Sequence, residues 1–77
     1  MMVDKQVSVA SSTDPTKVGR SGTVLQETAK TLLIETRSGR VRVEKKGAAF
    51  ILRDSGKVVV GDDITGRPED YIGRVRI

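Results

Sequence analysis

The chain has 77 residues, a formal net charge of +4, 36% hydrophobic residues, and neither cysteine nor histidine. This length predicts one small domain, because a chain of this size buries only about 60% of the surface that its unfolded form exposes. The missing thiols and imidazoles exclude disulfides, thiolate or imidazole catalysis and the usual zinc ligands.

The first half of the chain is predicted to form three short strands. Residues 1–4 show no periodic pattern, so we expect a frayed amino terminus followed by a single domain over residues 5–77. Val7 and Val9 alternate with polar neighbours, as in a half-buried strand, and a turn over residues 11–15 follows. Two further strands are expected at residues 23–26 and 31–36, joined as a hairpin.

The second half continues in the same manner. Residues 40–44 alternate strictly, so two valines are expected to face the core while Arg40 and Arg42 lie side by side on the opposite face. The apolar run 48–53 predicts a strand that is buried on both faces or bent, with Phe50 at the centre of the core. A turn leads to a strand at residues 58–60, and weak alternation over residues 71–77 fits a closing strand.

These elements predict an all-β fold, namely a small antiparallel barrel of five to six short strands with at most a short helical turn. The sequence has no amino-terminal apolar run and no stretch of about 18 apolar residues, so we expect a cytoplasmic protein that does not bind membranes.

Positive charge is concentrated in the middle of the chain. Residues 37–57 hold seven basic and two acidic side chains, whereas the segments before and after carry net charges of 0 and −1. Such a surplus favours a polyanionic partner, the alternative being a solvated face. Since only Phe50 and Tyr71 are aromatic, contacts to a phosphate backbone are favoured over base stacking.

Four carboxylates near the carboxyl end raise the possibility of a magnesium site for an independent nuclease; they are Asp62, Asp63, Glu69 and Asp70. Acidic residues in turns more often cap backbone amides or pair with nearby bases, and Arg67 is two residues from Glu69. Nothing else in the sequence completes a catalytic site. We therefore assign no catalytic residue and no metal ligand.

Three motifs occur in order along the chain: Glu27-Thr28, then Lys45-Lys46-Gly47 followed by Phe50, and finally Arg67-Pro68-Glu69-Asp70. With their flanking segments they cover nearly the whole chain. In this order and spacing they resemble the archaeal ribonuclease P protein component 1 family, which is related to the eukaryotic 29-kilodalton ribonuclease P subunit.

The resemblance implies an Sm-like β-barrel that binds RNA and is not itself a nuclease. In that family the RNA subunit removes the 5′ leader of precursor tRNA with the help of metal ions. The protein is thus expected to bind no cofactor, and magnesium is expected on the RNA. The implied partners are ribonuclease P RNA, precursor tRNA and a zinc-ribbon protein subunit.

The candidate residues follow from the basic cluster and from the resemblance together. Arg67 has two interpretations, since it either contacts RNA or locks the barrel through Glu69 and Asp70. The candidate RNA-binding residues are Arg37, Arg40, Arg42, Lys45, Lys46 and Arg67. The candidate structural residues of the motifs are Gly22, Gly47, Phe50, Pro68, Glu69 and Asp70.

Two departures from the family pattern concern the carboxyl end. The family's helix after the Arg-Pro-Glu-Asp motif has no counterpart here, and Tyr71 replaces a basic residue, so a minimal or truncated version is one expectation. Two other functions also stay open. Gly19 and Gly22 with Val24 fit the start of a KOW-type ribosomal or translation-associated RNA-binding barrel, and a peptide-binding or assembly barrel without nucleic acid is the second alternative.

Overall fold

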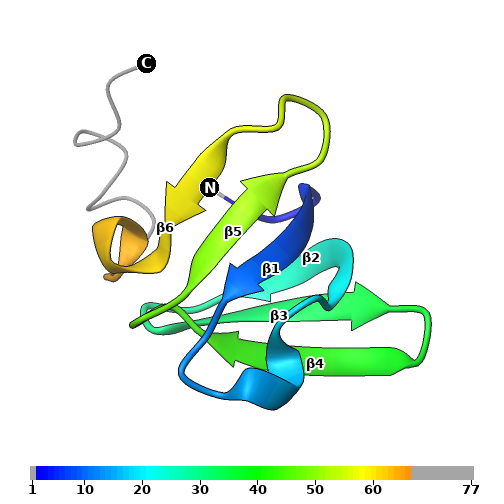
Figure 1. Ribbon diagram of the computed structural model, residues 1–77, viewed down its shortest axis with the longest axis horizontal. Helices are drawn as coiled ribbons and strands as arrows, with labels where there is room; N and C mark the ends of the chain where they lie inside the picture. The colour runs from blue at the N-terminus through cyan, green and yellow to red at the C-terminus, as the bar shows by residue number, and fades with distance from the viewer. Residues whose placement is uncertain (1, 67–77) are drawn as a thin grey trace.

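The computed structural model describes residues 2–66, and they form one antiparallel six-stranded sheet that curls around a single core (Figure 1). The strand order is β4-β3-β2-β1-β5-β6. The two short helical turns are of the 3₁₀ type. In chain order the elements are β1 (Gln6–Ser11), η1 (Pro15–Lys17), β2 (Ser21–Glu27), β3 (Thr31–Thr36), β4 (Gly39–Glu44), β5 (Ala49–Leu52), β6 (Val58–Val60) and η2 (Gly61–Ile64).

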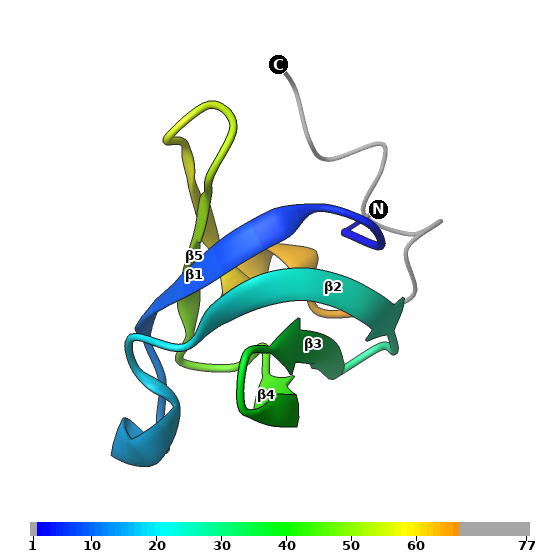
Figure 2. The same ribbon diagram turned by 90° about the vertical axis from the view of Figure 1, so that its right-hand side faces the viewer.

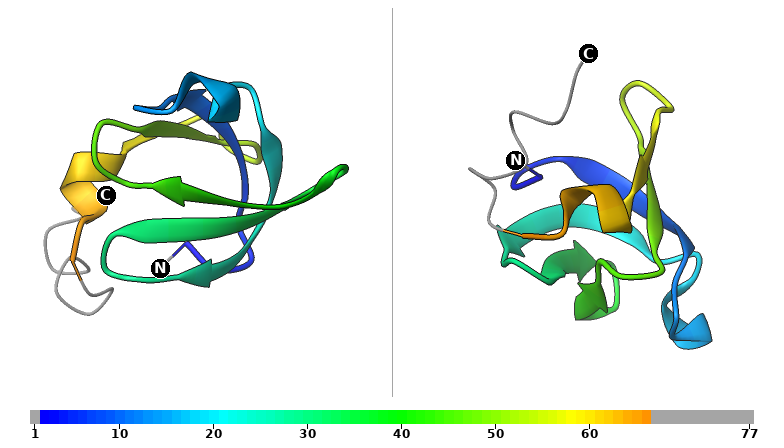
Figure 3. Two further views of the ribbon diagram at one scale, coloured as in Figure 1. Left: turned by 90° about the horizontal axis from the view of Figure 1, so that it is seen from below. Right: turned by 90° about the vertical axis from the view of Figure 1, so that its left-hand side faces the viewer.

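The all-β antiparallel expectation is confirmed, and the sheet curls without joining its two end strands, β4 and β6, in the described part of the chain (Figure 3). In Figure 2, β2 is a long curved strand that runs beside β1. Its register with β3 shifts between Val24 and Gln26, as at a β-bulge. Bulges bend a strand and increase its twist, so this one helps to close the curl.

Gly22 lies at another tight point of β2. A Cβ atom at this position would overlap the carbonyl oxygen of Glu35 on β3. Glycine is therefore required here by the close approach of two backbones.

The core is filled mainly by aliphatic side chains from inside the curled sheet. The aromatic ring of Phe50 lies among them at 0% exposure. Burial of this kind contributes about 25 cal/mol per Å² of apolar surface removed from water. The buried apolar residues are Met2, Val7, Val9, Val24, Leu32, Ile34, Val43, Ala48, Phe50 and Ile64.

Residues 2–4 differ from the expectation of a frayed amino terminus. Met2 is buried at 6% exposure, and its amide donates to Glu27 Oε1 at 2.8 Å. The amide of Asp4 donates to the Val24 carbonyl at 2.8 Å. The sequence does not reveal this, because a single buried methionine produces no periodic pattern.

The segment after β6 spans the gap between the end strands. The Lys45 ammonium, just after β4, donates to the Ile64 carbonyl of η2 at 2.8 Å. The Gly66 amide donates to the Ala29 carbonyl of the β2–β3 turn at 2.7 Å. The expected closing strand at residues 71–77 lies outside the described residues.

Candidate nucleic-acid interface

The β4 strand presents its two arginines outward, as its alternation predicts. Arg40 and Arg42 are exposed while Val43 is buried. Arg40 lies opposite Glu35 of β3, and its Nε is 3.8 Å from Glu35 Oε2. Since these side chains are 67% and 55% exposed, the pair is screened by water and adds little stability. The Arg40 guanidinium can therefore exchange this carboxylate for another anion.

Arg42 is connected to the helical turn η1, although η1 follows β1 and two strands lie between β1 and β4 in the sheet. Its Nη1 donates to Thr31 Oγ1 at 3.1 Å. Its carbonyl accepts a hydrogen bond from Lys17 Nζ. The curl of the sheet thus lays η1 against β4 (Figure 1), and Lys17 adds its positive charge to that of the strand.

The turn η1 is held by Asp14 at its amino end. Asp14 Oδ1 accepts from the Thr16 hydroxyl at 2.7 Å and from the Thr16 amide at 3.0 Å. These two bonds, with a smaller contribution from the nearby Lys17, hold the pKa of the Asp14 carboxyl below its usual value. The carboxylate stays charged and keeps Lys17 in place.

Arg20 joins the same surface from the chain between η1 and β2. Its Nη1 donates to Ser38 Oγ at 3.0 Å, and its Nε donates to the Thr16 carbonyl at 3.4 Å. Ser38 belongs to the β3–β4 turn, which also carries the exposed Arg37. We call the resulting surface the hairpin face; it consists of Lys17, Arg20, Arg37, Arg40 and Arg42.

Sequence reasoning did not include Lys17 and Arg20 among the RNA-binding candidates. They lie 17 or more residues before Arg37 in a segment with no net charge, so a count of charge along the chain assigns them to no cluster. Only the Pro15-containing turn was visible in the sequence. The contact of that turn with the β3–β4 hairpin depends on the curl of the sheet.

Lys46 is exposed at the other end of β4. It lines a hollow of about 540 Å³ together with Lys30, Thr31, Glu44 and Thr65. Two lysines and one carboxylate thus share this hollow. Lys46 is accessible to an anionic partner, but its charge is partly balanced by Glu44.

Lys45 does not lie on the surface, so the structure does not support its prediction as an RNA contact. Its side chain is 0% exposed, and its Nζ lies 2.8 Å from Glu27 Oε2, whose side chain is 1% exposed. The ammonium also donates to the Ile64 carbonyl at 2.8 Å. A buried ammonium needs such partners, because an unpaired charge in the interior is very costly. Lys45 is therefore a core residue and cannot meet a phosphate in this structure.

The bulge in β2 explains how Glu27 comes to face Lys45. Regular alternation from the buried Val24 would place Glu27, three residues later, on the opposite face. The register shift between Val24 and Gln26 inserts one residue, so Glu27 points inward beside the buried Leu32, its partner on β3. The pairing of Glu27 with Lys45 is thus a product of the sheet's bend.

The candidate structural residues are distributed as follows. Gly22 lies at the close approach of β2 and β3, and Phe50 lies in the core. Gly47 has a φ of +72°, and its amide donates to Asp62 Oδ1 at 3.1 Å. Asp62 thus caps a backbone amide. The remaining candidates, Arg67, Pro68, Glu69 and Asp70, lie outside the described residues.

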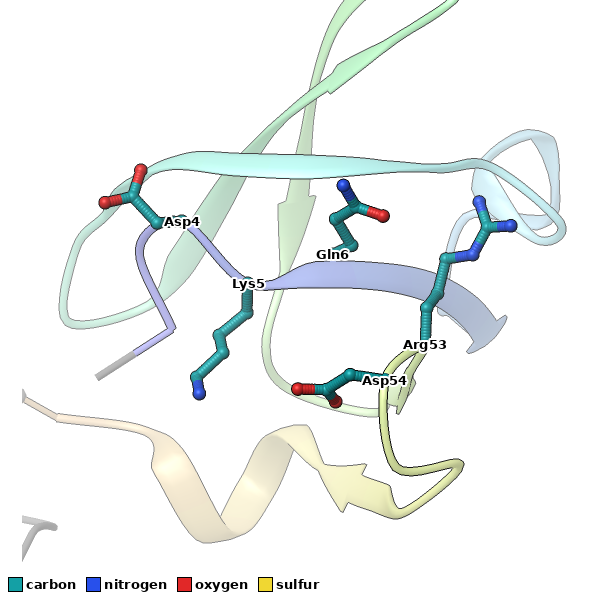
Figure 4. Close-up of a pocket in the computed structure, with 5 residues that line it drawn as sticks. All are labelled: Asp4, Lys5, Gln6, Arg53 and Asp54. Carbon is teal, nitrogen blue, oxygen red and sulfur yellow. The ribbon is translucent and has the colours of Figure 1, made fainter.

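A second group of basic residues lies in a pocket that is balanced in charge, unlike the hairpin face. Lys5 and Arg53 line a pocket of about 450 Å³ with Asp4, Gln6 and Asp54. Figure 4 shows that the Asp54 side chain extends toward Lys5, whereas the Asp4 and Arg53 side chains extend away from them. Since the charges cancel, this pocket attracts phosphate less than the hairpin face does.

Among residues 2–66, no group of three or more Asp and Glu side chains is arranged to hold a metal ion. The helical turns of this part are too short to cross a membrane.

The known proteins that are similar in sequence to this chain are all ribonuclease P proteins. Residues 5–74 match the family described as "Ribonuclease P/MRP, subunit p29". The ribonuclease P protein component 1 of Staphylothermus marinus is 41% identical over 78 residues, which cover 96% of this chain and 85% of the relative. The protein of the same name from Desulfurococcus amylolyticus is 42% identical with the same coverage.

A solved structure gives the same answer at the level of the fold. It is described as Mth11, a homologue of human RNase P protein Rpp29, and it matches with a TM-score of 0.64 and 32% identity. The match covers 91% of this chain and 95% of that one. Together these similarities show that the chain belongs to the ribonuclease P/MRP p29 family, a family of ribonuclease P protein subunits.

Proposed function

We propose that this protein is a noncatalytic RNA-binding subunit of ribonuclease P that supports removal of the 5′ leader from precursor tRNA. Membership in the family supports a place in the ribonuclease P complex, and the hairpin face supplies the positive charge for binding RNA. Five basic side chains lie there against two carboxylates, Asp14 and Glu35. This observation carries the proposal.

The chemistry of the face suits a phosphate backbone more than bases. Arginine offers a planar fork of donors to phosphate oxygens, and lysine offers a compact charge. Binding of this kind releases counterions, so affinity should fall steeply with salt. No aromatic side chain of residues 2–66 belongs to the face, so recognition relies on the shape of a folded RNA.

The catalytic step belongs to the RNA in this proposal. Magnesium ions bound to the RNA would supply the nucleophile, and the protein would lower the magnesium requirement by neutralising phosphates and steadying the RNA fold. The proposed partners are ribonuclease P RNA, precursor tRNA and a zinc-ribbon protein subunit. The cytoplasm is the proposed site of action.

Reconstituted cleavage tests the proposal. Ribonuclease P RNA from the source organism is incubated with precursor tRNA at limiting magnesium, with and without the protein. We expect faster leader removal with the protein, and no cleavage by the protein alone. An absence of enhancement at every magnesium concentration would refute the assignment.

The RNA that copurifies with the tagged protein separates this function from the KOW-type alternative. Ribonuclease P RNA supports the proposal. Enrichment of ribosomal RNA with large-subunit proteins would instead support the ribosomal or translation-associated barrel. Absence of any structured RNA would favour an assembly barrel.

A further inference from the structure

A small pocket at the rim of the curled sheet combines two guanidinium groups and two hydroxyls. It has a volume of about 340 Å³, near the lower end of ligand-binding pockets. The pocket lies where the chain enters β2 and where β3 turns into β4. Its lining residues are Arg20, Thr36, Ser38, Gly39, Arg40 and Val41.

Arg20 is held in place before any ligand arrives. Its hydrogen bonds to Ser38 Oγ at 3.0 Å and to the Thr16 carbonyl at 3.4 Å use Nη1 and Nε. The second terminal nitrogen, Nη2, has no hydrogen bond to another residue of the described part. A side chain that is already ordered loses less entropy on binding, so its contact with a ligand is worth more.

The turn opposite Arg20 is also ordered. The Thr36 hydroxyl donates to the Gly39 carbonyl at 2.6 Å, and the Ser38 amide donates to Thr36 Oγ1 at 3.3 Å. Gly39 has a φ of +128°, and no atom lies within 4 Å of where its Cβ would be. The backbone is thus bare at this point, and an RNA strand can approach it closely.

The charge of the pocket selects an anion. Glu35 pairs only loosely with Arg40, at 3.8 Å on an exposed surface, and Arg20 forms no ion pair within residues 2–66. The lining of the pocket therefore presents two guanidinium groups and no carboxylate among the described residues, and Glu35 is held only weakly beside it by Arg40. Its size fits one phosphate group with part of its sugar, and it lacks an aromatic platform for a base.

We propose that this pocket is a preorganised cradle for one phosphodiester of a folded RNA, with Arg20 as its fixed donor and Arg40 as its mobile one. We call it the phosphate cradle. The inference rests on the proposed RNA-binding function and deepens it, because it places a specific contact outside the basic segment 37–57. Ser38 acts as a positioning residue that orients Arg20.

Salt-dependent binding of a ribonuclease P RNA transcript tests the cradle. Affinity is measured by filter binding from 50 to 400 mM potassium chloride for the wild type and for Arg20→Gln, Arg20→Lys and Ser38→Ala. Lys57→Gln, in the exposed β5–β6 turn, is the matched control. Thermal unfolding of each variant is recorded, so that a loss of folding is not taken for a loss of contact.

The four variants have different expected results. Arg20→Gln should bind about threefold to tenfold more weakly, with the log-log salt slope reduced by about 0.7–0.9. Arg20→Lys and Ser38→Ala should weaken binding less and keep the slope, because the charge remains while its orientation is lost. Lys57→Gln should resemble the wild type.

Other outcomes overturn the inference. If the wild type binds with a steep salt slope and Arg20→Gln keeps it, the cradle is wrong while the proposed function stands. If the wild type neither binds the transcript nor enhances cleavage, the proposed function itself fails. Saturation of the site by inorganic phosphate or a mononucleotide at submillimolar concentration would identify a free-anion pocket and would likewise overturn the cradle.

Discussion

Lys45 and Lys46 are neighbours in the sequence, yet one belongs to the interior and the other to the surface. Lys45 is fully buried against Glu27 and η2, whereas Lys46 is exposed beside Glu44. The same contrast separates the buried ion pair from the hairpin face. In the first region the charge is used to join parts of the chain, and in the second it is available to a partner.

The difference teaches that charge in this barrel has two functions that its sequence does not distinguish. The ion pair connects the ends of the curl, since Glu27 receives the Met2 amide at 2.8 Å while Lys45 reaches the Ile64 carbonyl at 2.8 Å. A buried pair costs desolvation that its mutual attraction barely offsets. Its value therefore lies in fixing which segments meet.

Removal of one member of the buried pair should have the largest effect. Lys45→Met leaves the Glu27 carboxylate buried without its ammonium partner, so we expect a loss of about 3–5 kcal/mol in the free energy of unfolding. Lys46→Met is the matched control and should change that free energy by less than about 0.5 kcal/mol. Urea denaturation of both variants measures the difference.

The double variant Glu27→Leu with Lys45→Met sharpens this result. It replaces both charges with apolar groups and should recover most of the lost stability, because no charge is left unpaired. If Lys45→Met proves as stable as Lys46→Met, the buried pair does not hold the curl together. If the double variant is as unstable as Lys45→Met, the pair contributes stability of its own and not only specificity.

The contact between η2 and Lys45 of the buried pair leads to the next prediction. A Cβ atom at Gly61 would overlap the Lys45 carbonyl oxygen, so Gly61→Ala should destabilise the protein by about 1–3 kcal/mol through displacement of η2. Gly56→Ala is a control in an exposed turn, where φ is +73° and no atom lies within 4 Å. It should cost only about 1 kcal/mol, from backbone strain. Equal losses in thermal unfolding would mean that crowding at Gly61 is relieved cheaply.

Sequence reasoning predicted the strands well because alternation and turn residues are local signals. The strand expected at residues 31–36 is β3, and the one at 58–60 is β6. The outward display of Arg40 and Arg42 follows from the same alternation. These features depend only on neighbours in the chain.

The buried lysine could not be predicted in this way. Glu27 lies 18 residues before Lys45, and it was expected in the connection between two strands. Its inward direction arises from the bulge in β2, which shifts the alternation by one residue. A pattern of two adjacent lysines carries no information about such a distant partner.

Neutralising the outer face of β4 should affect RNA binding and leave the fold intact. Arg40→Gln with Arg42→Gln removes two exposed charges, so we expect binding to a ribonuclease P RNA transcript to weaken about tenfold, equivalent to about 1.4 kcal/mol. The log-log salt slope should fall by about 1.4–1.8. Lys5→Gln with Arg53→Gln, in the charge-balanced pocket of Figure 4, is the matched control. Equal losses from both pairs would show that only overall charge matters.

Acid should loosen η1, and this is the smallest expected effect. The hydrogen bonds from Thr16 lower the pKa of Asp14 in the folded state. Its contribution to stability is therefore present above the ordinary value of 3.8 and is lost as the pH falls through the lowered folded value. Asp14→Ala should thus be less stable than the wild type at pH 6, and the gap should narrow in acid toward the difference between Asp14→Asn and Asp14→Ala.

The size of that gap is limited by exposure, since η1 contains no buried residue. Asp14→Asn is the matched control, because its amide oxygen still accepts a hydrogen bond from Thr16 without titrating. Its stability relative to Asp14→Ala should be independent of pH between 2 and 6 in thermal unfolding. A gap between wild type and Asp14→Ala that is as large at pH 2 as at pH 6 would mean that the charge of Asp14 does not hold the turn.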